Sequence, residues 1–253
     1  MNDNDEKFSD SEILSRSERL LGKEGMRKLR DVKVIVFGIG GVGSWCAEAL
    51  VRSGVRKITL VDGDKVAGSN INRQLMATVE TVGEVKVEAM KKHLLSVAPD
   101  AEIKILHKNF SAENSAEFEL DSYDYIIDAI DSLKDKAALI ELATRTHARL
   151  FSSMGAALKM DPTRVRVAEF RNAIGCPLAR ALRNRFKRSG HFPRKKFKVV
   201  YSDEVLPNLG AEPEGEKSEM DKRKAQINGS LMHITAIFGL TLAGLVIKDV
   251  TGK

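Results

Sequence analysis

The stretch VIVFGIGGVGS, residues 34–44, decides the fold of this chain of 253 residues. Its β-rich apolar half predicts a strand buried on both faces of a parallel sheet, and its glycines predict a turn into a helix. Gly38, Gly40 and Gly43 have the spacing of a dinucleotide-binding loop, whereas Gly41 is an additional glycine inside that pattern. Glycine lets backbone N–H groups approach a phosphate, and the following helix presents its positive end to the anion. The stretch therefore indicates a nucleotide site and leaves open which nucleotide binds.

Strand and helix patterns alternate on both sides of this loop, which indicates a doubly wound, Rossmann-like α/β fold with a mostly parallel sheet. The expected strands are 32–37, 57–62, 102–107, 123–130 and 150–155, and the expected helices are 17–29, 43–53, 83–97 and 132–147. The pattern then changes to an alternating, antiparallel type of strand, a basic amphipathic helix, a polar loop or lid and an apolar helix, at 164–170, 177–188, 207–224 and 231–247. We expect one domain, 1–253, with a nucleotide-binding core over 1–160 and a second region over 161–253.

Composition narrows the class of protein. A hydrophobic fraction of 43% and a charged fraction of 30% are typical of soluble globular proteins, and the net charge of +6 allows a polyanionic partner. Cys46 and Cys176 are the two cysteines, so no CxxC pair can bind zinc, and a reducing, cytoplasmic location is favoured. Residues 231–247 hold 17 residues without a charge, fewer than the ~20 that cross a bilayer. A core or dimer-interface helix is favoured there over peripheral membrane association.

Charged residues after the glycine loop favour a nucleoside triphosphate over a dinucleotide. Asp62 closes the second expected strand, where a carboxylate accepts hydrogen bonds from ribose hydroxyls. Asn70, Arg73 and Lys86 follow, and a triphosphate needs such cationic partners as charge builds on its leaving pyrophosphate. A dinucleotide oxidoreductase does not need them.

Two further carboxylates stand at the end of the fourth expected strand, in the segment DAIDS, residues 128–132. Ligands of open α/β sheets bind at this edge, and a carboxylate beside a triphosphate is a typical Mg²⁺ ligand. Asp128 and Asp131 are therefore expected at the nucleotide, and Asp131 is the candidate metal ligand.

The segments GIGGVGS, DGD, SNINRQ, VGEVKVE and DAIDS, in this order over residues 17–155, resemble the ubiquitin-activating-enzyme-like adenylation family. That family includes the molybdopterin-synthase and thiamine-pathway adenylyltransferases. The resemblance implies that an acyl-adenylate forms from ATP and Mg²⁺. It also implies a homodimer, because an N-terminal arginine of the family reaches the partner subunit's γ-phosphate; Arg19 matches best and Arg16 is the second candidate. Carried over by motif, the catalytic residues are Arg19, Arg73, Lys86 and Asp131, and the nucleotide-binding residues are Gly38, Gly40, Gly41, Gly43, Asp62, Asn70, Arg73, Lys86, Asp128 and Asp131.

Motifs across nearly the whole chain resemble one branch of that family, the tRNA threonylcarbamoyladenosine dehydratases. They are SERLLG, DAIDSLKDKAALI, DPTRVRV, PLARALRNRFKR and YSDE, together with the apolar C-terminal segment containing AIFG. The resemblance implies ATP-dependent cyclisation of N6-threonylcarbamoyladenosine in tRNA, with a sulfur-transfer protein as a further candidate partner. One alternative is an enzyme that activates the C-terminus of a ubiquitin-like or sulfur-carrier protein; another is a non-catalytic nucleotide-sensing or tRNA-binding module. Val199 and Val200 stand where some relatives are expected to carry a cysteine, and Cys176 is the remaining candidate thiol.

Residues 180–198 hold nine Lys or Arg and no acidic residue. Such a run attracts a phosphate backbone, and Phe186, Phe192 and Phe197 could stack on exposed bases. With the resemblance, tRNA becomes the expected partner of region 161–253. The candidate nucleic-acid contacts are Arg180, Arg183, Arg185, Lys187, Arg188, Arg194, Lys195, Lys196 and Lys198.

Overall fold

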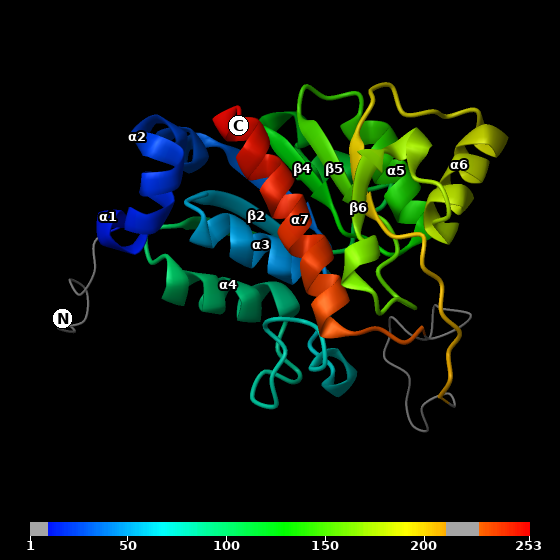
Figure 1. The fold of residues 1–253 in the computed structure, drawn as a ribbon, viewed down its shortest axis with the longest axis horizontal. Helices are drawn as coiled ribbons and strands as arrows, with labels where there is room; N and C mark the ends of the chain where they lie inside the picture. The colour runs from blue at the N-terminus through cyan, green and yellow to red at the C-terminus, as the bar shows by residue number, and fades with distance from the viewer. Residues whose placement is uncertain (1–9, 211–227) are drawn as a thin grey trace.

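The computed structural model describes residues 10–210 and 228–253, and these residues form one seven-stranded sheet (Figure 1). The strand order is β3-β2-β1-β4-β5-β7-β6, and β6 is antiparallel to β7 while all other neighbours are parallel. The doubly wound, mostly parallel sheet with antiparallel C-terminal strands is confirmed. The strands are β1 Lys33–Phe37, β2 Lys57–Val61, β3 Glu102–Leu106, β4 Tyr125–Asp128, β5 Arg149–Ser153, β6 Arg166–Glu169 and β7 Lys198–Tyr201.

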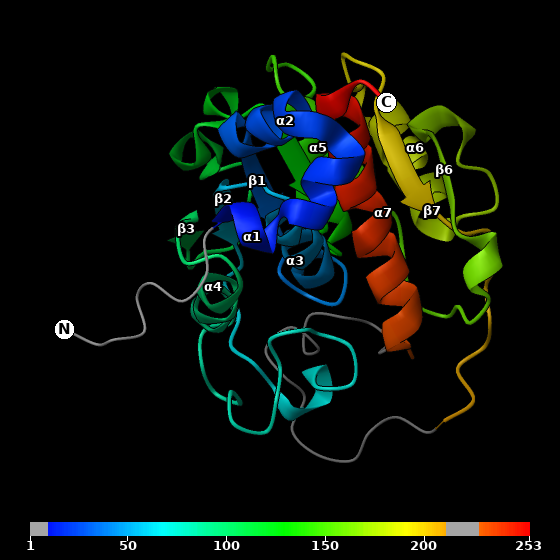
Figure 2. The same cartoon turned by 60° about the vertical axis from the view of Figure 1, so that its left-hand side comes forward.

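Helices cover both faces of the sheet, with α3, α4 and α7 on one face and α5 and α6 on the other (Figures 1 and 2). The helix α2 bends at Gly22, whose φ of 75° lies outside the helical range, so the expected N-terminal helix is a kinked one. The α-helices are α1 Asp10–Ile13, α2 Ser15–Asp31, α3 Gly43–Arg52, α4 Lys86–Val97, α5 Leu133–Ala143, α6 Pro177–Ser189 and α7 Met232–Thr251.

Two hydrophobic cores lie on the two faces because successive side chains of a strand point to opposite sides. In β1, Val34 and Val36 pack beneath α3, α4 and α7, whereas Ile35 and Phe37 pack beneath α5. All four side chains are fully buried. A strand buried on both faces is what its uninterrupted apolar sequence predicts.

The apolar C-terminal segment forms α7, which packs against α2, α3, β5 and β7. Gly239 makes the closest approach: a Cβ built there would lie 2.4 Å from the carbonyl oxygen of Val42. Among the described residues α7 is the one helix long and apolar enough to span a membrane, and 44% of its most apolar window is buried inside the protein. Its contacts are those of a core helix.

Residues beyond 160 complete the sheet and do not form a separate layer. The strand β7 inserts between β5 and β6, so one sheet runs through both expected regions. The basic helix expected at 177–188 is confirmed as α6. Of the loop expected at 207–224, residues 207–210 have no regular structure and the rest lies outside the described residues.

Candidate functional site

The turn between β1 and α3 has room only for glycine at two positions. Gly38 has a φ of 84° and its N–H donates to the carbonyl oxygen of Val61 at 2.8 Å. A Cβ at Gly38 would lie 2.7 Å from the carbonyl oxygen of Ala129, and one at Gly43 would lie 1.8 Å from that of Gly38. The turn itself therefore requires glycine at these two positions. It brings β1, β2 and β4 together at the carboxyl edge of the sheet.

The middle of the loop meets side chains from the segment that follows β2. A Cβ at Gly41 would lie 3.2 Å from Cγ of Arg73 and 3.2 Å from the Thr235 side chain on α7, so the additional glycine is packed by the protein itself. At Gly40 the nearest such atom is Nε2 of Gln74, at 3.8 Å.

Gln74 was missed by sequence reasoning, although it directly follows Arg73 in SNINRQ. Its side chain is buried, and its Oε1 has no hydrogen-bond partner within the described parts of the chain. Buried polar atoms without a partner are rare, and they occur where a ligand or water supplies one. The Gln74 amide nitrogen thus adjoins Gly40, while its oxygen is buried without a partner among the described residues.

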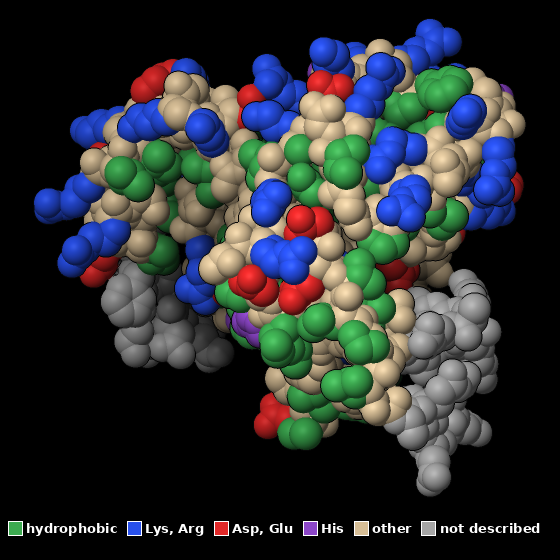
Figure 3. Space-filling view, turned by 45° about the vertical axis from the view of Figure 1, so that its right-hand side comes forward, with side chains coloured by type: hydrophobic (Ala, Val, Ile, Leu, Met, Phe, Trp, Pro, Cys, Tyr) green, Lys and Arg blue, Asp and Glu red, His purple; other side chains and the backbone are tan. Residues whose placement is uncertain are grey.

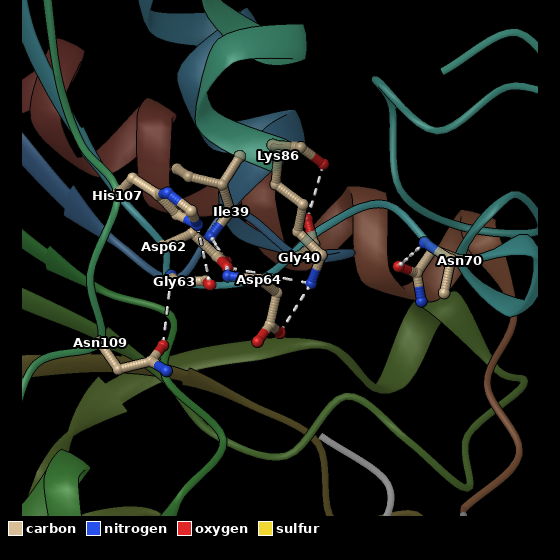
Figure 4. Close-up of polar contacts among 11 residues, drawn as sticks. Ile39, Gly40, Asp62, Gly63, Asp64, Asn70, Lys86, His107 and Asn109 are labelled. Atoms are coloured by element: carbon tan, nitrogen blue, oxygen red, sulfur yellow. Dashed lines mark hydrogen bonds and ion pairs between the residues drawn. The ribbon is translucent and has the colours of Figure 1, made fainter. Parts of the chain in front are cut away.

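Asp62 and Lys86 form a buried charged cluster beside the loop (Figure 4). Asp62 accepts from the backbone N–H of Ile39 at 2.7 Å and from that of Asp64 at 2.9 Å. Lys86 is 1% exposed, and its Nζ lies 3.0 Å from Oδ2 of Asp64 and 3.9 Å from Oδ1 of Asp62. Burial raises the pKa of the Asp62 carboxyl, and Lys86 partly offsets this by favouring the charged form. Asp64 was quoted in the DGD motif without a role, and the structure shows that it holds the Lys86 ammonium.

Two polar side chains of the SNINRQ segment are held by that segment itself. Oδ1 of Asn70 accepts from the N–H of Ala67 at 3.0 Å, which fixes the turn before Arg73. Nη1 of Arg73 donates to the Ser69 carbonyl and to the Asn72 side chain, both at 2.8 Å. Asn70 is buried and Arg73 is half-buried, so both lie at the loop but are turned toward their own turn in this structure.

The expectation that Asp128 contacts the nucleotide needs correction. Its side chain is fully buried: Oδ2 lies 2.8 Å from Nζ of Lys136 and accepts from the Ser152 hydroxyl at 2.6 Å, while Oδ1 accepts from the N–H of Ile130 at 3.1 Å. Lys136, also fully buried, donates to the Ile130 carbonyl at 2.9 Å. The pair holds the backbone after β4, which leads into Asp131. The buried side chain of Asp128 therefore fixes the backbone that precedes Asp131.

Asp131 is exposed just beyond β4, on the segment that the buried pair holds. In the parts of the chain that the structure describes, no three His, Cys, Asp or Glu side chains group closely enough to hold a metal alone. Mg²⁺ at nucleotide sites usually takes one or two protein carboxylates and completes its shell with phosphates and water. One exposed carboxylate at this edge fits that pattern.

Arg19 and Arg16 are exposed on α2, which packs against α7 and adjoins the turn that follows α3, away from the glycine loop. At that end Gly54 adjoins Met26 of α2, with 2.8 Å between a built Cβ and the methionine Cε. The ten residues of α3 span about 15 Å at 1.5 Å per residue, which separates this contact of α2 from the glycine loop of the same chain.

The predicted nucleic-acid residues divide into exposed and structural ones. Arg183 donates to the carbonyls of Phe170 and Ala173 and lies over the Phe170 ring, so it fixes α6 against the strand layer and is not free for a phosphate. Phe186 and Phe197 are buried in the core beneath α6, which corrects the expectation that they stack on bases, whereas Phe192 is 54% exposed. The remaining eight cations are exposed: Arg180, Arg185, Lys187, Arg188, Arg194, Lys195, Lys196 and Lys198.

Both cysteines are buried. Cys46 lies inside α3, where burial raises the pKa of its thiol far above the ordinary value, and Cys176 lies at the start of α6 with 1% exposure. A thiol that reacts is usually exposed in part and lowered in pKa. Neither cysteine has the exposure expected of an acyl-accepting thiol.

Residues 14–253 match the ThiF family. The chain is 37% identical to the tRNA threonylcarbamoyladenosine dehydratase of Bacillus subtilis (strain 168), over 93% of each chain. The crystal structure of the E. coli tRNA N6-threonylcarbamoyladenosine dehydratase TcdA in complex with ATP superposes with a TM-score of 0.84 at 32% identity, over 96% of each chain. The adenylyltransferase and sulfurtransferase MOCS3 of Anopheles gambiae is 32% identical, but over 61% of this chain and 35% of that protein.

Proposed function

Because the chain belongs to the ThiF family, we propose that it uses ATP to dehydrate N6-threonylcarbamoyladenosine in tRNA, closing it to the cyclic form through an acyl-adenylate. The observation that carries the proposal is the extent of its similarity to relatives with that name, which includes both expected regions of the chain. The MOCS3 match stays within part of the chain, so activation of a sulfur carrier has weaker support.

The first step forms a mixed anhydride. The threonyl carboxylate attacks the α-phosphate of ATP, and pyrophosphate leaves with the electrons of the broken P–O bond. Lys86 brings a buried positive charge to the loop, and Arg73 lies against Gly41 within reach of it. Charge that builds on the leaving phosphates is best stabilised by cations fixed in advance, and the two carboxylates around Lys86 fix its ammonium.

The nucleoside end of ATP is assigned to Asp62, whose two backbone hydrogen bonds fix the carboxylate and leave lone pairs for ribose hydroxyls. Asn70 is assigned to the phosphates, and the backbone at Gly38, Gly40, Gly41 and Gly43 forms the floor. Asp131 would hold Mg²⁺, which neutralises phosphate charge when bound.

The second step closes the ring. An atom of the neighbouring carbamoyl group attacks the activated carbonyl, AMP leaves and a proton is lost, so the adenosine has lost one water. The attack is intramolecular, and proximity supplies much of the acceleration without an enzyme thiol. That agrees with two buried cysteines, which offer no exposed thiol to a sulfur-transfer partner either.

The active unit is proposed to be a homodimer in which Arg19, or Arg16 as the second candidate, completes the partner's nucleotide site. The contact of α2 at the far end of α3 supports this, because it places the helix that carries both arginines away from the glycine loop of its own chain. The exposed cations of residues 180–198 are proposed to contact tRNA, and a cytoplasmic location follows from that substrate.

AMP release tests the assignment. Replacing the exposed Asp131 by Ala should lower AMP formation with ATP and modified tRNA by about 100-fold or more, with an unchanged unfolding curve. Glu102→Ala, which removes an exposed carboxylate at the start of β3 on the opposite edge of the sheet, is the matched control and should keep activity. AMP formed only with a protein ending in a free C-terminal glycine would favour the carrier-activating alternative, and ATP binding without AMP would favour a sensing module.

A further inference from the structure

A basic cavity of about 580 Å³ lies between the starts of β5 and β7 and the end of α7. Six cationic residues line it: Arg149 and Lys198 at the two strand starts, Lys195 and Lys196 before β7, and Lys248 and Lys253 at the end of α7. In Figure 1 the C-terminal end of α7 is at the top of the molecule, and Figure 3 shows Lys and Arg side chains gathered across that upper part.

The cavity is on the opposite side of the molecule from the glycine loop. Parallel strands place all their starts at one edge and all their ends at the other, and the nucleotide site lies at the ends. Figures 1 and 2 agree: the segment around residues 68–82 lies at the bottom and the end of α7 at the top. The five residues of β5 alone span about 17 Å at 3.3 Å per residue.

Acidic residues balance little of the charge. Asp249 is the carboxylate in the lining, and it is already engaged by Nη1 of Arg149 at 2.5 Å and by the Tyr125 hydroxyl at 2.6 Å. Glu169 lies 3.8 Å from Nζ of Lys196, whose side chain is 84% exposed. The negative end of the helix dipole lies at the C-terminus of α7 and favours cations there, which accounts for Lys248 and Lys253 but not for the cations of the strands and loop.

We propose that this basic cavity is a second RNA-binding site, which binds backbone phosphates of the tRNA away from the reacting adenosine. The inference rests on the proposed function and adds Arg149, Lys248 and Lys253 to the RNA contacts. All six cationic residues are exposed, but Arg149 is paired with Asp249, and Lys195 and Lys253 donate to the carbonyls of Thr146 and Leu20. Lys196, Lys198 and Lys248 therefore offer the cations best placed for phosphates. At about 3.4 Å per nucleotide step, an RNA must extend by roughly five or more steps from the glycine-loop edge to reach it.

The test compares two RNAs and two triple variants. Lys196→Ala, Lys198→Ala and Lys248→Ala together should weaken binding of full-length tRNA by about tenfold or more at low salt, and should lower the slope of log affinity against log salt by about 2–3. Binding of a trinucleotide that carries the modified adenosine should change less than about twofold, because a strand of ~10 Å does not reach the basic cavity. ATP affinity serves as the measure of an intact fold.

The matched control is the triple variant of Lys33, Lys57 and Lys104, which line a hollow at the other end of the same sheet edge beside Glu102 and Glu119. It removes the same charge and should leave the salt slope unchanged. Equal losses in both variants, unchanged binding of tRNA to the first, or an equal loss with the trinucleotide would overturn the proposal. Because binding is the readout, wild-type protein that binds tRNA through the basic cavity but never forms AMP would refute the proposed reaction and keep this inference.

Discussion

Asp128→Asn separates two roles that the DAIDS segment could have, nucleotide binding and positioning. The change is isosteric and removes one charge from a pair in which both side chains are fully buried, with 2.8 Å between Asp128 Oδ2 and Lys136 Nζ. Two unit charges at that distance attract by about 6 kcal/mol at an effective dielectric constant of ~20. Much of that attraction offsets desolvation, and breaking such a pair typically costs about 3–5 kcal/mol because the other charge is left buried.

A loss of this size is large against the ~5–15 kcal/mol that stabilises a typical protein. It should lower the thermal midpoint by about 6–20 °C, at ~2–4 °C per kcal/mol for a chain of this length. Urea unfolding measures the free energy, and ATP titration below the transition measures affinity, which should fall less than about threefold. AMP formation should fall more, because the backbone before Asp131 loses its anchor.

Lys136→Met in the same chain is the control. It removes the orphaned cation, so the double variant should recover most of the lost stability and fall short by about 1–3 kcal/mol, since the Ile130 carbonyl loses its donor. The reasoning is refuted if Asp128→Asn keeps its stability within about 1 kcal/mol and loses ATP affinity tenfold, because Asp128 would then be a ligand of the nucleotide.

Three further predictions concern other parts of the molecule. Burial opposes ionisation of Glu48, but hydrogen bonds from His93 and Arg52 lower its pKa below the ordinary value. The charged carboxylate therefore stabilises the folded protein above about pH 4.3, and this stabilisation is lost as pH falls through the pKa of Glu48 in the folded state. Glu48→Gln should cost about 1 kcal/mol of unfolding free energy in urea at pH 7 and nothing near pH 3. An equal loss of unfolding free energy at both pH values would show that Glu48 stabilises the protein through packing and not through its charge. Gly43→Ala, whose Cβ has no space, should unfold the loop or the protein, whereas Gly41→Ala should displace Arg73 by a few tenths of an ångström and lower AMP formation more than ATP affinity; equal losses at Gly41 would contradict this. Arg19→Ala and Arg73→Ala should each abolish AMP formation alone. When the two variants are mixed, about half of the dimers contain one subunit of each kind, and each of these mixed dimers has one site with both arginines intact, so activity should partly return. No recovery on mixing would exclude Arg19 as the residue that crosses between subunits.

The strand segments and the glycine turn could be predicted because they depend on local signals. An uninterrupted apolar run such as 34–37 suits a strand covered on both faces. Gly38 has a positive φ, which favours glycine, so the turn is recognisable in the sequence. The candidate ATP residues also follow strand ends in order, and Asp62 and Lys86 do meet beside the loop.

Side-chain direction could not be predicted in the same way. Asp128 and Asp131 look equivalent in DAIDS, but the pleat of β4 sends Asp128 inward, where Lys136 from the next helix meets it. Arg183 and Phe186 lie on the core side of α6, although their segment reads as one continuous basic run. The basic cavity depends on α7 ending beside the starts of β5 and β7, which lie about 100 and about 50 residues earlier in the chain.

The most direct measurement follows the adenosine itself. The protein is incubated with ATP and tRNA that carries N6-threonylcarbamoyladenosine, the tRNA is digested to nucleosides, and their masses are recorded with the AMP released. The proposed function predicts a modified adenosine lighter by one water, formed together with AMP and absent when ATP is omitted. An unchanged nucleoside under conditions in which the protein binds both ATP and tRNA would contradict it.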